Sequence, residues 1–470
     1  LNIRKIHENF EKYSKEYGGV FTVWLPKPYV VITNDELLKE TFSKKETIYH
    51  NIENGGVIFP QGKNWREQRR TFLQILRDIG IGKNLMEEQV LLSAQEFLKH
   101  LASMENKEEL SLKWPIQLYI ANIINKLLYG FSYEHDNDDR LRAVVDGLTT
   151  FTEAIKGSKL ALIAQLFPVI YRIPVLGYLS KGRFVDVLKR PRRTIKDDVD
   201  RALQSYSVDQ EPECLVQAYY QKMQANPNLK YANLLNVCLD FFTAGMETTA
   251  TTLRWGTLFL ATHPDVQEKI RAEILSVVGR DGKPTSSMRT RMPYTNAAIQ
   301  EIQRLATTIS VNVTHRTIRD TSVGNVRIPA DTLIIADIHP IMDHSPVSDH
   351  GHEFHPERFL MKDGVTRTKK ADDQLCPFSI GKQQCAGETL ARAGLFAGVV
   401  TLLQNYELIA LIRRIATFYP ITLAADNGTI KIKIKTVGHR RGEASERTIE
   451  ESTVRVLQPG PPFHPQGDAP

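Results

Sequence analysis

Apolar side chains recur through most of the chain at the spacing of amphipathic or buried helices. The pattern begins with an expected helix over 1–17, and it continues from 83 to 206 with breaks at glycines. The longest expected helix runs from about 231 to 261, and another apolar helix is expected from 390 to 403. The pattern therefore predicts a mainly helical protein.

A smaller β region is indicated by short runs of β-branched and aromatic residues. The expected strands lie at 20–23, 29–33, 323–328 and 332–336. A hairpin is also expected over 421–436, where the dipeptide Asn427-Gly428 favours a type I′ turn. The fold class predicted from these patterns is mainly α with a smaller β region.

The end of the 470-residue chain differs in composition from the rest. Residues 437–470 are charged and then proline-rich, with few apolar side chains to bury. We therefore expect one domain over 1–436, followed by a disordered tail over 437–470.

Composition, charge and cysteine usage exclude several classes of protein. Hydrophobic residues make up 42% of the chain and charged residues 24%, which is ordinary for a globular domain. The net charge of +6 is small for this length, and no basic run with interleaved aromatics indicates nucleic-acid binding. The four cysteines have no CxxC spacing, so neither a disulfide framework nor a zinc ribbon is expected.

No uninterrupted apolar run reaches the length of a membrane span. The chain starts with Leu1 rather than Met, so we expect that a preceding segment is missing. An apolar stretch over 160–176 is interrupted by Pro168 and Pro174, which makes it too short to cross a bilayer. It is consistent with core packing, with the roof of a pocket, or with shallow insertion into a membrane surface.

The candidate chemistry centres on Cys385, which lies between glycines just before the helix expected at 390–403. A thiol there faces unpaired backbone N–H groups and the positive end of the helix dipole, so its pKa is expected to fall. Gly381 permits a tight turn, while Ala386 and Gly387 leave room for a flat, bulky group. Such a thiolate suits an axial ligand of haem iron, and the alternative is a structural cysteine in a glycine-rich loop.

The surrounding string, Phe378-x-x-Gly381-x-x-x-Cys385-x-Gly387, resembles the haem-binding loop of the cytochrome P450 superfamily. The resemblance extends over roughly 1–410 and implies a cytochrome P450 fold that encloses a b-type haem. It implies that the Cys385 thiolate is the metal ligand. The loop residues implied to bind the cofactor are Phe378, Gly381, Gln383, Cys385 and Gly387.

The middle of the longest expected helix reads Ala244-Gly245-x-Glu247-Thr248. Glycine and threonine are poor interior helix residues, and a threonine hydroxyl can bond back to the carbonyl four residues earlier and bend the helix. Taken alone, this stretch is at least as consistent with a polar, threonine-rich helix face as with a functional site. In the resembled family it is the oxygen-activating stretch, which implies that Glu247 brings protons and Thr248 holds the activated oxygen. Ala244 and Val313 are the implied substrate-pocket residues.

Three further charged residues complete the family pattern. Glu301 and Arg304 are three apart on an expected helix, and such pairs are usually surface ion pairs of small energy. Downstream, Arg358 belongs to the string Pro-Glu-Arg-Phe. The resemblance implies that Arg358 packs onto the Glu301–Arg304 pair and fixes the chain beneath the haem.

The haem propionates need hydrogen-bond donors once they are enclosed. The resemblance implies Trp65, Arg69 and His315 as donors, although a basic helix face and a surface histidine are the ordinary interpretations of these residues. One position departs from the family, because Gln383 stands where an arginine or histidine is usual. A neutral amide loses a charge-assisted contact worth on the order of 1 kcal/mol or more.

The resemblance implies a monooxygenase that inserts one atom of O2 into a small apolar molecule such as a xenobiotic, steroid or fatty acid. Electrons would come from NADPH through a separate reductase, with cytochrome b5 as a further donor, since no nucleotide-binding glycine fingerprint is found. The implied location is the cytosolic face of the endoplasmic reticulum membrane. The alternative function is a haem-binding relative without turnover, either a decayed enzyme or a sensor.

Overall fold

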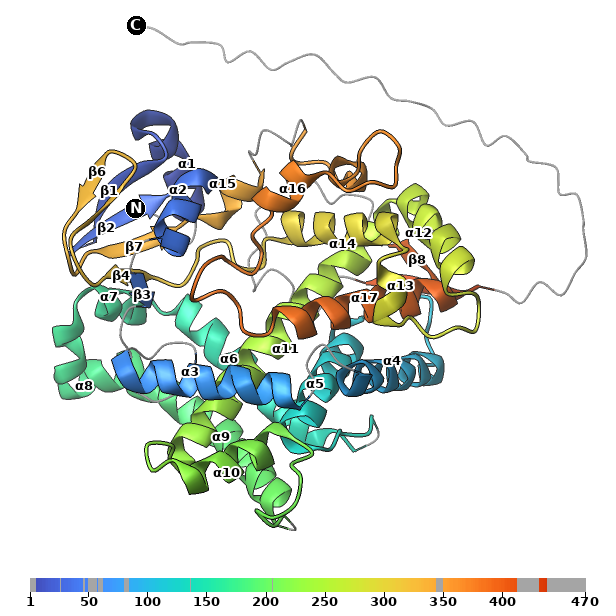
Figure 1. The fold of residues 1–470 in the computed structure, drawn as a ribbon, viewed down its shortest axis with the longest axis horizontal. Coiled ribbons are helices and arrows are strands. Elements are labelled where there is room, and N and C mark those ends of the chain that lie inside the picture. Colours follow the sequence, from blue (N-terminus) through green and yellow to red (C-terminus); the bar gives the residue numbers. More distant parts are fainter. Residues whose placement is uncertain are drawn as a thin grey trace, which may run out of the picture. The chain divides into compact units, whose positions relative to one another are not determined.

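A long helix, α11 (Tyr231–Thr262), runs through the helical part of the protein and packs against elements from both halves of the sequence (Figure 1). We describe it in a computed structural model. The residues that the structure describes are 6–25, 27–44, 47–49, 57, 62–79, 84–135, 137–204, 206–343, 350–411 and 431–437. Residues 1–436 form one compact unit.

Helices before α11 supply much of the scaffold around it. They are α1 (Ile6–Tyr17), α2 (Asp35–Lys39), α3 (Gly62–Asp78), α4 (Asn84–Ser103), α5 (Lys113–Tyr129), α6 (Asp139–Gly157), α7 (Lys159–Leu166), α8 (Pro174–Gly177), α9 (Arg183–Leu203) and α10 (Leu215–Ala225). Helix α5 packs most extensively on α11, and it is buried on nearly every side. An almost wholly apolar helix of this kind is expected in the middle of a core.

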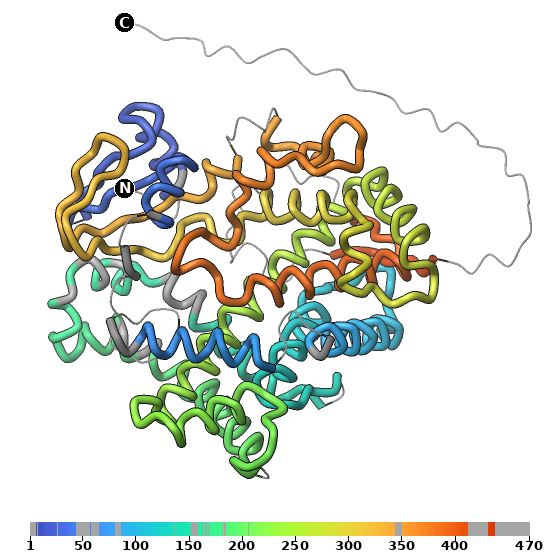
Figure 2. Tube along the Cα trace, viewed as in Figure 1, coloured from blue at the N-terminus to red at the C-terminus, as the bar shows by residue number. Residues whose placement is uncertain are grey.

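Helices after α11 cover its other side. They are α12 (Pro264–Val277), α13 (Ser286–Arg289), α14 (Pro293–Ala306), α15 (Ile338–Asp343), α16 (Lys369–Gln374) and α17 (Glu388–Asn405). Helices α14 and α17 both pack on α11, and α17 also contacts α4 (Figure 2). The predicted helices at 231–261 and 390–403 are therefore confirmed as α11 and α17.

The β region consists of one five-stranded sheet and two small antiparallel pairs. The strands are β1 (Val20–Leu25), β2 (Lys27–Ile32), β3 (Thr47–Tyr49), β4 (His315–Thr317), β5 (Thr321–Val323), β6 (Val326–Ile328), β7 (Leu333–Ala336), β8 (Tyr406–Ala410) and β9 (Ile432–Thr436). The large sheet has the order β1-β2-β7-β4-β3, in which only the β2–β7 pair is parallel. The predicted first hairpin is confirmed as β1 and β2.

Residues 47–49 form strand β3, because their backbone pairs with that of β4. Strand β9, which covers the end of the hairpin predicted over 421–436, pairs with β8 in an antiparallel ladder. Residues 412–430, including the predicted Asn427-Gly428 turn, lie outside the described residues. The predicted tail over 437–470 also lies outside them, apart from Val437.

No helix among the described residues is long and apolar enough to cross a membrane.

Candidate functional site

The Cys385 loop is a tight turn that delivers the thiol to the N-terminus of α17. The Cys385 N–H donates to the Phe378 carbonyl over 3.0 Å, and the Gln384 N–H donates to the Gly381 carbonyl over 3.1 Å. Gly387 is the N-terminal cap residue of α17, and its carbonyl accepts from the Ala391 N–H over 2.9 Å. These hydrogen bonds join backbone groups only, so the backbone of the loop fixes the position of the sulfur.

The two glycines of the motif serve different purposes. Gly381 has φ of +84°, and a Cβ there would lie 2.0 Å from the Phe42 carbonyl oxygen, so no other residue fits. Gly387 has φ of −96°, and a Cβ there would meet only Phe241, at 3.8 Å. The fold itself does not require glycine at 387. The absent side chain instead leaves space on the cavity side of the loop.

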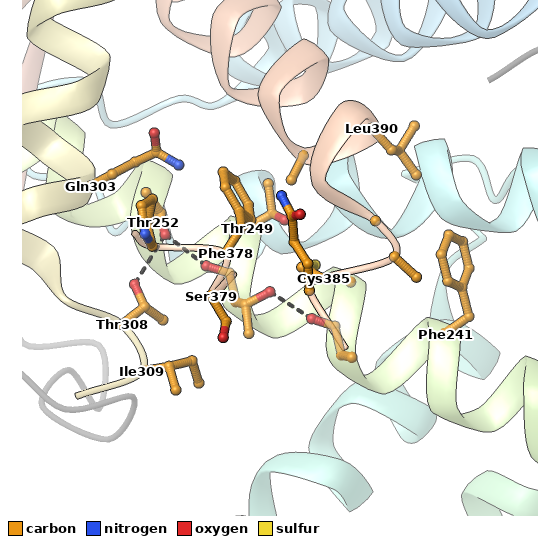
Figure 3. A pocket seen from close by; sticks show the side chains of 18 of the residues that line it. Phe241, Thr249, Thr252, Gln303, Thr308, Ile309, Phe378, Ser379, Cys385 and Leu390 are labelled. Carbon is orange, nitrogen blue, oxygen red and sulfur yellow. Dashed lines mark hydrogen bonds between the residues drawn. The ribbon is translucent and has the colours of Figure 1, made fainter. Parts of the chain in front are cut away.

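A cavity of about 290 Å³ lies between α11, α5 and the Cys385 loop (Figure 3). Its walls are mostly apolar, with side chains such as Ile120, Phe241, Phe378 and Leu390. Cys385 lies inside the fold, but its side chain has accessible surface because it lines this cavity. An apolar chamber with one accessible thiol is a site for a flat, apolar cofactor bound through sulfur.

The predicted fall in the pKa of Cys385 is wrong for the polypeptide without a bound metal. Burial is the largest influence and raises the pKa of the thiol above its ordinary value. The Gly387 N–H and the Arg69 cation act in the opposite direction, with smaller effect. A coordinated metal cation deprotonates a thiol outright, so burial does not prevent ligation.

Helix α11 brings a threonine to the opposite wall of the cavity. The Thr248 hydroxyl donates to the Ala244 carbonyl over 2.5 Å, which is the back-bonding that bends helices. Ala244, Gly245 and Thr248 all line the cavity, and so does Val313 from the segment after α14. The structure therefore places Thr248 and both predicted pocket residues around the space that Cys385 faces.

Glu247 points elsewhere. Its carboxylate accepts from Gln117 Nε2 of α5 over 3.0 Å and from the Thr251 hydroxyl over 3.3 Å. Among the described residues it is not part of the cavity wall. Gln117 is buried, so the carboxylate is held by a partner that solvent does not reach. A proton carried by Glu247 has to cross from this contact to the cavity.

The structure brings Glu301, Arg304 and Arg358 into one buried ion cluster. Arg304 donates to both Glu301 oxygens, through Nε over 2.7 Å and through Nη2 over 3.0 Å. Arg358 Nε donates to Glu301 Oε1 over 2.8 Å, and the Glu301 side chain is 0% exposed. The same oxygen accepts from the His355 N–H, so the carboxylate is well satisfied. Such a network fixes the segment before α16 against α14.

The predicted propionate donors divide into two groups. Arg69 and Gln383 line the cavity, and Arg69 Nη2 donates to the Gln384 carbonyl over 2.5 Å. Trp65 is not one of the described residues that line the cavity. Its Nε1 donates instead to the Val57 carbonyl over 3.0 Å. His315 is also set back, since it is buried and stacked on Phe42 with ring centroids 4.0 Å apart.

His315 is neutral at physiological pH, because burial lowers its pKa to about 4. Its Nδ1 lies 2.8 Å from the Val313 carbonyl, which makes Nδ1 the protonated nitrogen. A neutral imidazole of this tautomer has its Nε2 as an acceptor rather than a donor. The expected contact of His315 with a propionate therefore needs a change of tautomer or protonation.

The cavity also has polar lining that the sequence analysis did not single out. Asp240 accepts from the Val57 N–H over 2.8 Å, and the hydroxyls of Thr252 and Thr308 lie 3.0 Å apart (Figure 3). Gln303 is buried beside them, and no described residue bonds its Oε1. Asp240 could have been found from the sequence, because it precedes Ala244 by four residues on the same helix face. The others depend on contacts between α11 and α14.

The residues of the cavity fit a haem. They supply a thiol, an apolar chamber, the space beside Gly387, and the polar groups of Arg69 and Gln383 at its margin. A mainly helical fold with such a thiol-bearing chamber defines the haem-thiolate class of proteins.

Comparison with known proteins gives the family. The chain matches the family model for cytochrome P450 over residues 1–416. It is 32% identical to Cytochrome P450 2H2 of Gallus gallus, over 87% of this chain and 84% of that protein. It is also 32% identical to Cytochrome P450 2J3 of Rattus norvegicus (86% and 82% covered) and to Cytochrome P450 2F2 of Mus musculus (88% and 85% covered). The chain belongs to the cytochrome P450 family.

Membership establishes the general chemistry. The protein is a haem-thiolate monooxygenase that uses haem b with a cysteine thiolate as axial ligand, and it receives electrons from a reductase. The predicted fold class, cofactor and enzyme class are therefore confirmed. Neither the fold nor the comparisons favour the alternative without turnover.

Proposed function

We propose that this chain oxygenates a small, largely apolar molecule in the chamber between α11 and the Cys385 loop, with Cys385 as the sulfur ligand. The observation that carries the proposal is the enclosed thiol of Cys385, which has accessible surface and lines the apolar cavity. A purely structural cysteine would be packed against side chains, as Cys238 is.

The bound haem supplies activation of O2 and insertion of one oxygen atom into the substrate. The residues of the chain have separate tasks around it. Phe378 and Gly387 line the cavity together with Cys385, and the mostly apolar walls disfavour water there. Thr248, whose hydroxyl bonds the Ala244 carbonyl, lines the cavity, where it can orient water or a proton. Glu247 delivers protons after leaving its contact with Gln117.

The substrate is expected to be apolar with a limited number of polar groups. Ala244 and Val313 offer only small or aliphatic surface, while Asp240 and the Thr252–Thr308 pair add polar points on the wall. Xenobiotics, steroids and fatty acids have this character. Arg69 and Gln383, with Trp65 and His315 behind them, are the groups proposed to meet the propionates.

The experiment is the absorption spectrum of the reduced, CO-bound protein. Wild type should show the strongly red-shifted band that reports thiolate ligation. Cys385→Ala should lose this band, whereas Cys376→Ala, which removes the other cysteine lining the cavity, should keep it. Retention of the band by Cys385→Ala would refute the assignment. Its loss in both variants would point to a general effect on folding, which circular dichroism can detect.

We further propose that the protein works at the cytosolic face of the endoplasmic reticulum membrane with an NADPH-dependent reductase, with cytochrome b5 as a second donor. The segment from α7 to the turn after α8 supports membrane contact, because it exposes a group of large apolar side chains. They are Ile163, Phe167, Val169, Tyr171, Ile173, Val175, Leu176, Tyr178 and Leu179. An apolar patch of this extent usually marks a contact surface.

Flotation with liposomes tests this surface. Val169 and Val175, at 62% and 70% exposed, are the most exposed of the group. A double change to Asp should reduce the bound fraction, while Val365→Asp, at an equally exposed valine elsewhere, should not. Equal binding of all three proteins would exclude the patch as a membrane contact.

We also propose that the folded domain ends near Thr436 and that 437–470 is a disordered tail.

A further inference from the structure

Two threonine hydroxyls and one amide form a polar corner at one end of the main cavity. Thr252 lies on α11, one helical turn after Thr248, and Thr308 lies two residues beyond the end of α14. The two hydroxyl oxygens are 3.0 Å apart. Figure 3 shows both side chains, together with that of Gln303, at the end of the pocket away from Phe241. The packing of α11 on α14 therefore builds the polar corner, which consists of Thr252, Thr308 and Gln303.

The single hydroxyl hydrogen of Thr252 is already used, because Oγ1 donates to the Thr248 carbonyl over 2.9 Å. A hydroxyl has one hydrogen and two lone pairs, so the contact between the two hydroxyls has to be a bond from Thr308 to Thr252. Once Thr308 has donated its hydrogen in this way, it offers the cavity only a lone pair. Thr308 is half-buried and lines the cavity, so a ligand can reach this acceptor.

Gln303 adds unused hydrogen-bonding capacity beside the two threonines. It is 5% exposed and lines the cavity, and its Oε1 has no hydrogen-bond partner among the described residues. Half a turn about the last side-chain bond exchanges the amide oxygen and nitrogen, so Gln303 can present either a donor or an acceptor. The group that matches the polar corner therefore has to donate to Thr308 and can also accept from Gln303.

Several other polar groups of the cavity wall are already engaged within the wall. Asn312 donates through Nδ2 to Ser379 Oγ over 2.9 Å, and its Oδ1 accepts from the Val313 N–H over 2.8 Å. The Thr307 hydroxyl donates to the Arg304 carbonyl over 2.6 Å. These groups hold the wall together, whereas the acceptor at Thr308 faces the apolar chamber.

We propose that the polar corner binds a hydroxyl group of the substrate, so that an apolar molecule with one free hydroxyl is preferred over the corresponding ketone. The substrate hydroxyl donates to Thr308 Oγ1 and accepts from the Gln303 amide. A ketone has no hydrogen to donate, and Thr308 can turn its own hydrogen towards a ketone only if Thr252 gives up its bond to the Thr248 carbonyl. This inference rests on the proposed oxygenation of a small apolar molecule in the chamber, and it specifies one polar group of that molecule.

Three probes with the same carbon skeleton test the proposal: cyclododecanol, cyclododecanone and cyclododecane. Their dissociation constants for the haem-loaded chain are measured from the change in haem absorption during titration. The alcohol should bind about fivefold more tightly than the ketone, which is the worth of one net hydrogen bond. Cyclododecane reports binding to the apolar walls alone.

The three probes separate failure of this inference from failure of the proposed function. Binding of cyclododecane without a preference for the alcohol over the ketone would overturn the role of the polar corner and leave the proposed function intact. A protein that binds none of the three and lacks the red-shifted CO band would refute the proposed function, and this inference with it.

Variants locate the preference. Thr308→Val keeps the shape of the side chain and removes the hydroxyl, so the alcohol and the ketone should bind within about twofold of each other. Thr308→Ser retains the hydroxyl and should retain the preference. Thr249→Val is the control, at a buried threonine elsewhere on the cavity wall, and should also retain it. A preference that survives Thr308→Val, or that is lost to the same extent in Thr249→Val, would overturn the proposal. The wild-type comparison of alcohol and ketone is decisive even if a variant fails to fold.

Discussion

Replacement of Asp337 by Asn should remove a strong pH dependence from the stability of this protein. Asp337 lies between β7 and α15, and its side chain is 0% exposed. Neither carboxylate oxygen has a well-aligned hydrogen-bond partner among the described residues. Burial raises the pKa of Asp337 from 3.8 to about 8; the nearby His339 backbone N–H partly opposes this rise, and the charge of Glu11 adds to it.

The sign and size of the effect follow from proton linkage. Between about pH 4 and pH 8 the native protein keeps a proton on Asp337 that the unfolded chain has released. The free energy of unfolding therefore falls as pH rises, by about 1.4 kcal/mol per pH unit. The Asn variant has no such proton. Its stability relative to wild type should rise by about 4 kcal/mol between pH 5 and pH 8.

Urea unfolding followed by circular dichroism at pH 5, 6, 7 and 8 measures this difference. The two proteins should be nearly equally stable at pH 5, where the neutral acid and the amide have similar shape and polarity. Asp209→Asn, at an exposed position, is the control and should follow wild type at every pH. If the curves for wild type and Asp337→Asn run parallel, the carboxyl group is not buried as described, or water reaches it.

Three other changes test the main site. Gly381→Ala should cost roughly 3 kcal/mol or more, because it combines a left-handed φ with a Cβ 2.0 Å from the Phe42 oxygen; Gly364→Ala, which has φ of +69° and open space, should cost about 1–2 kcal/mol in the same urea assay. Gln383→Arg should slow haem loss to an apo-globin acceptor roughly tenfold without moving the CO band, since it adds a charged donor at the cavity margin; an unchanged rate would mean that another cation already serves the propionate. Thr248→Ala should leave stability nearly unchanged, because among the described residues its hydroxyl bonds only the Ala244 carbonyl of the same helix, but it should lower the product formed per NADPH consumed; an unaltered ratio would remove Thr248 from the mechanism.

The sequence by itself determined the elements that carry the site. Helices α11 and α17 follow from apolar periodicity, and a glycine at 381 follows from the tight turn before Cys385, although only the fold brings the Phe42 carbonyl against it. The order of the charged and cysteine motifs was enough to indicate the family. Patterns of this kind are local, since each depends on backbone geometry and on neighbours a few residues away.

The tertiary structure alone decided where the side chains point. Glu247 and Thr248 are adjacent in sequence, yet the first bonds Gln117 of α5 and the second lines the cavity, since successive residues of a helix face different neighbours. The antiparallel pairing of β8 with β9, and the burial of Asp337 between sheet and helix, likewise depend on distant parts of the chain. Which neighbour covers a helix face or a strand edge is set by packing between elements, and local periodicity carries no record of that choice.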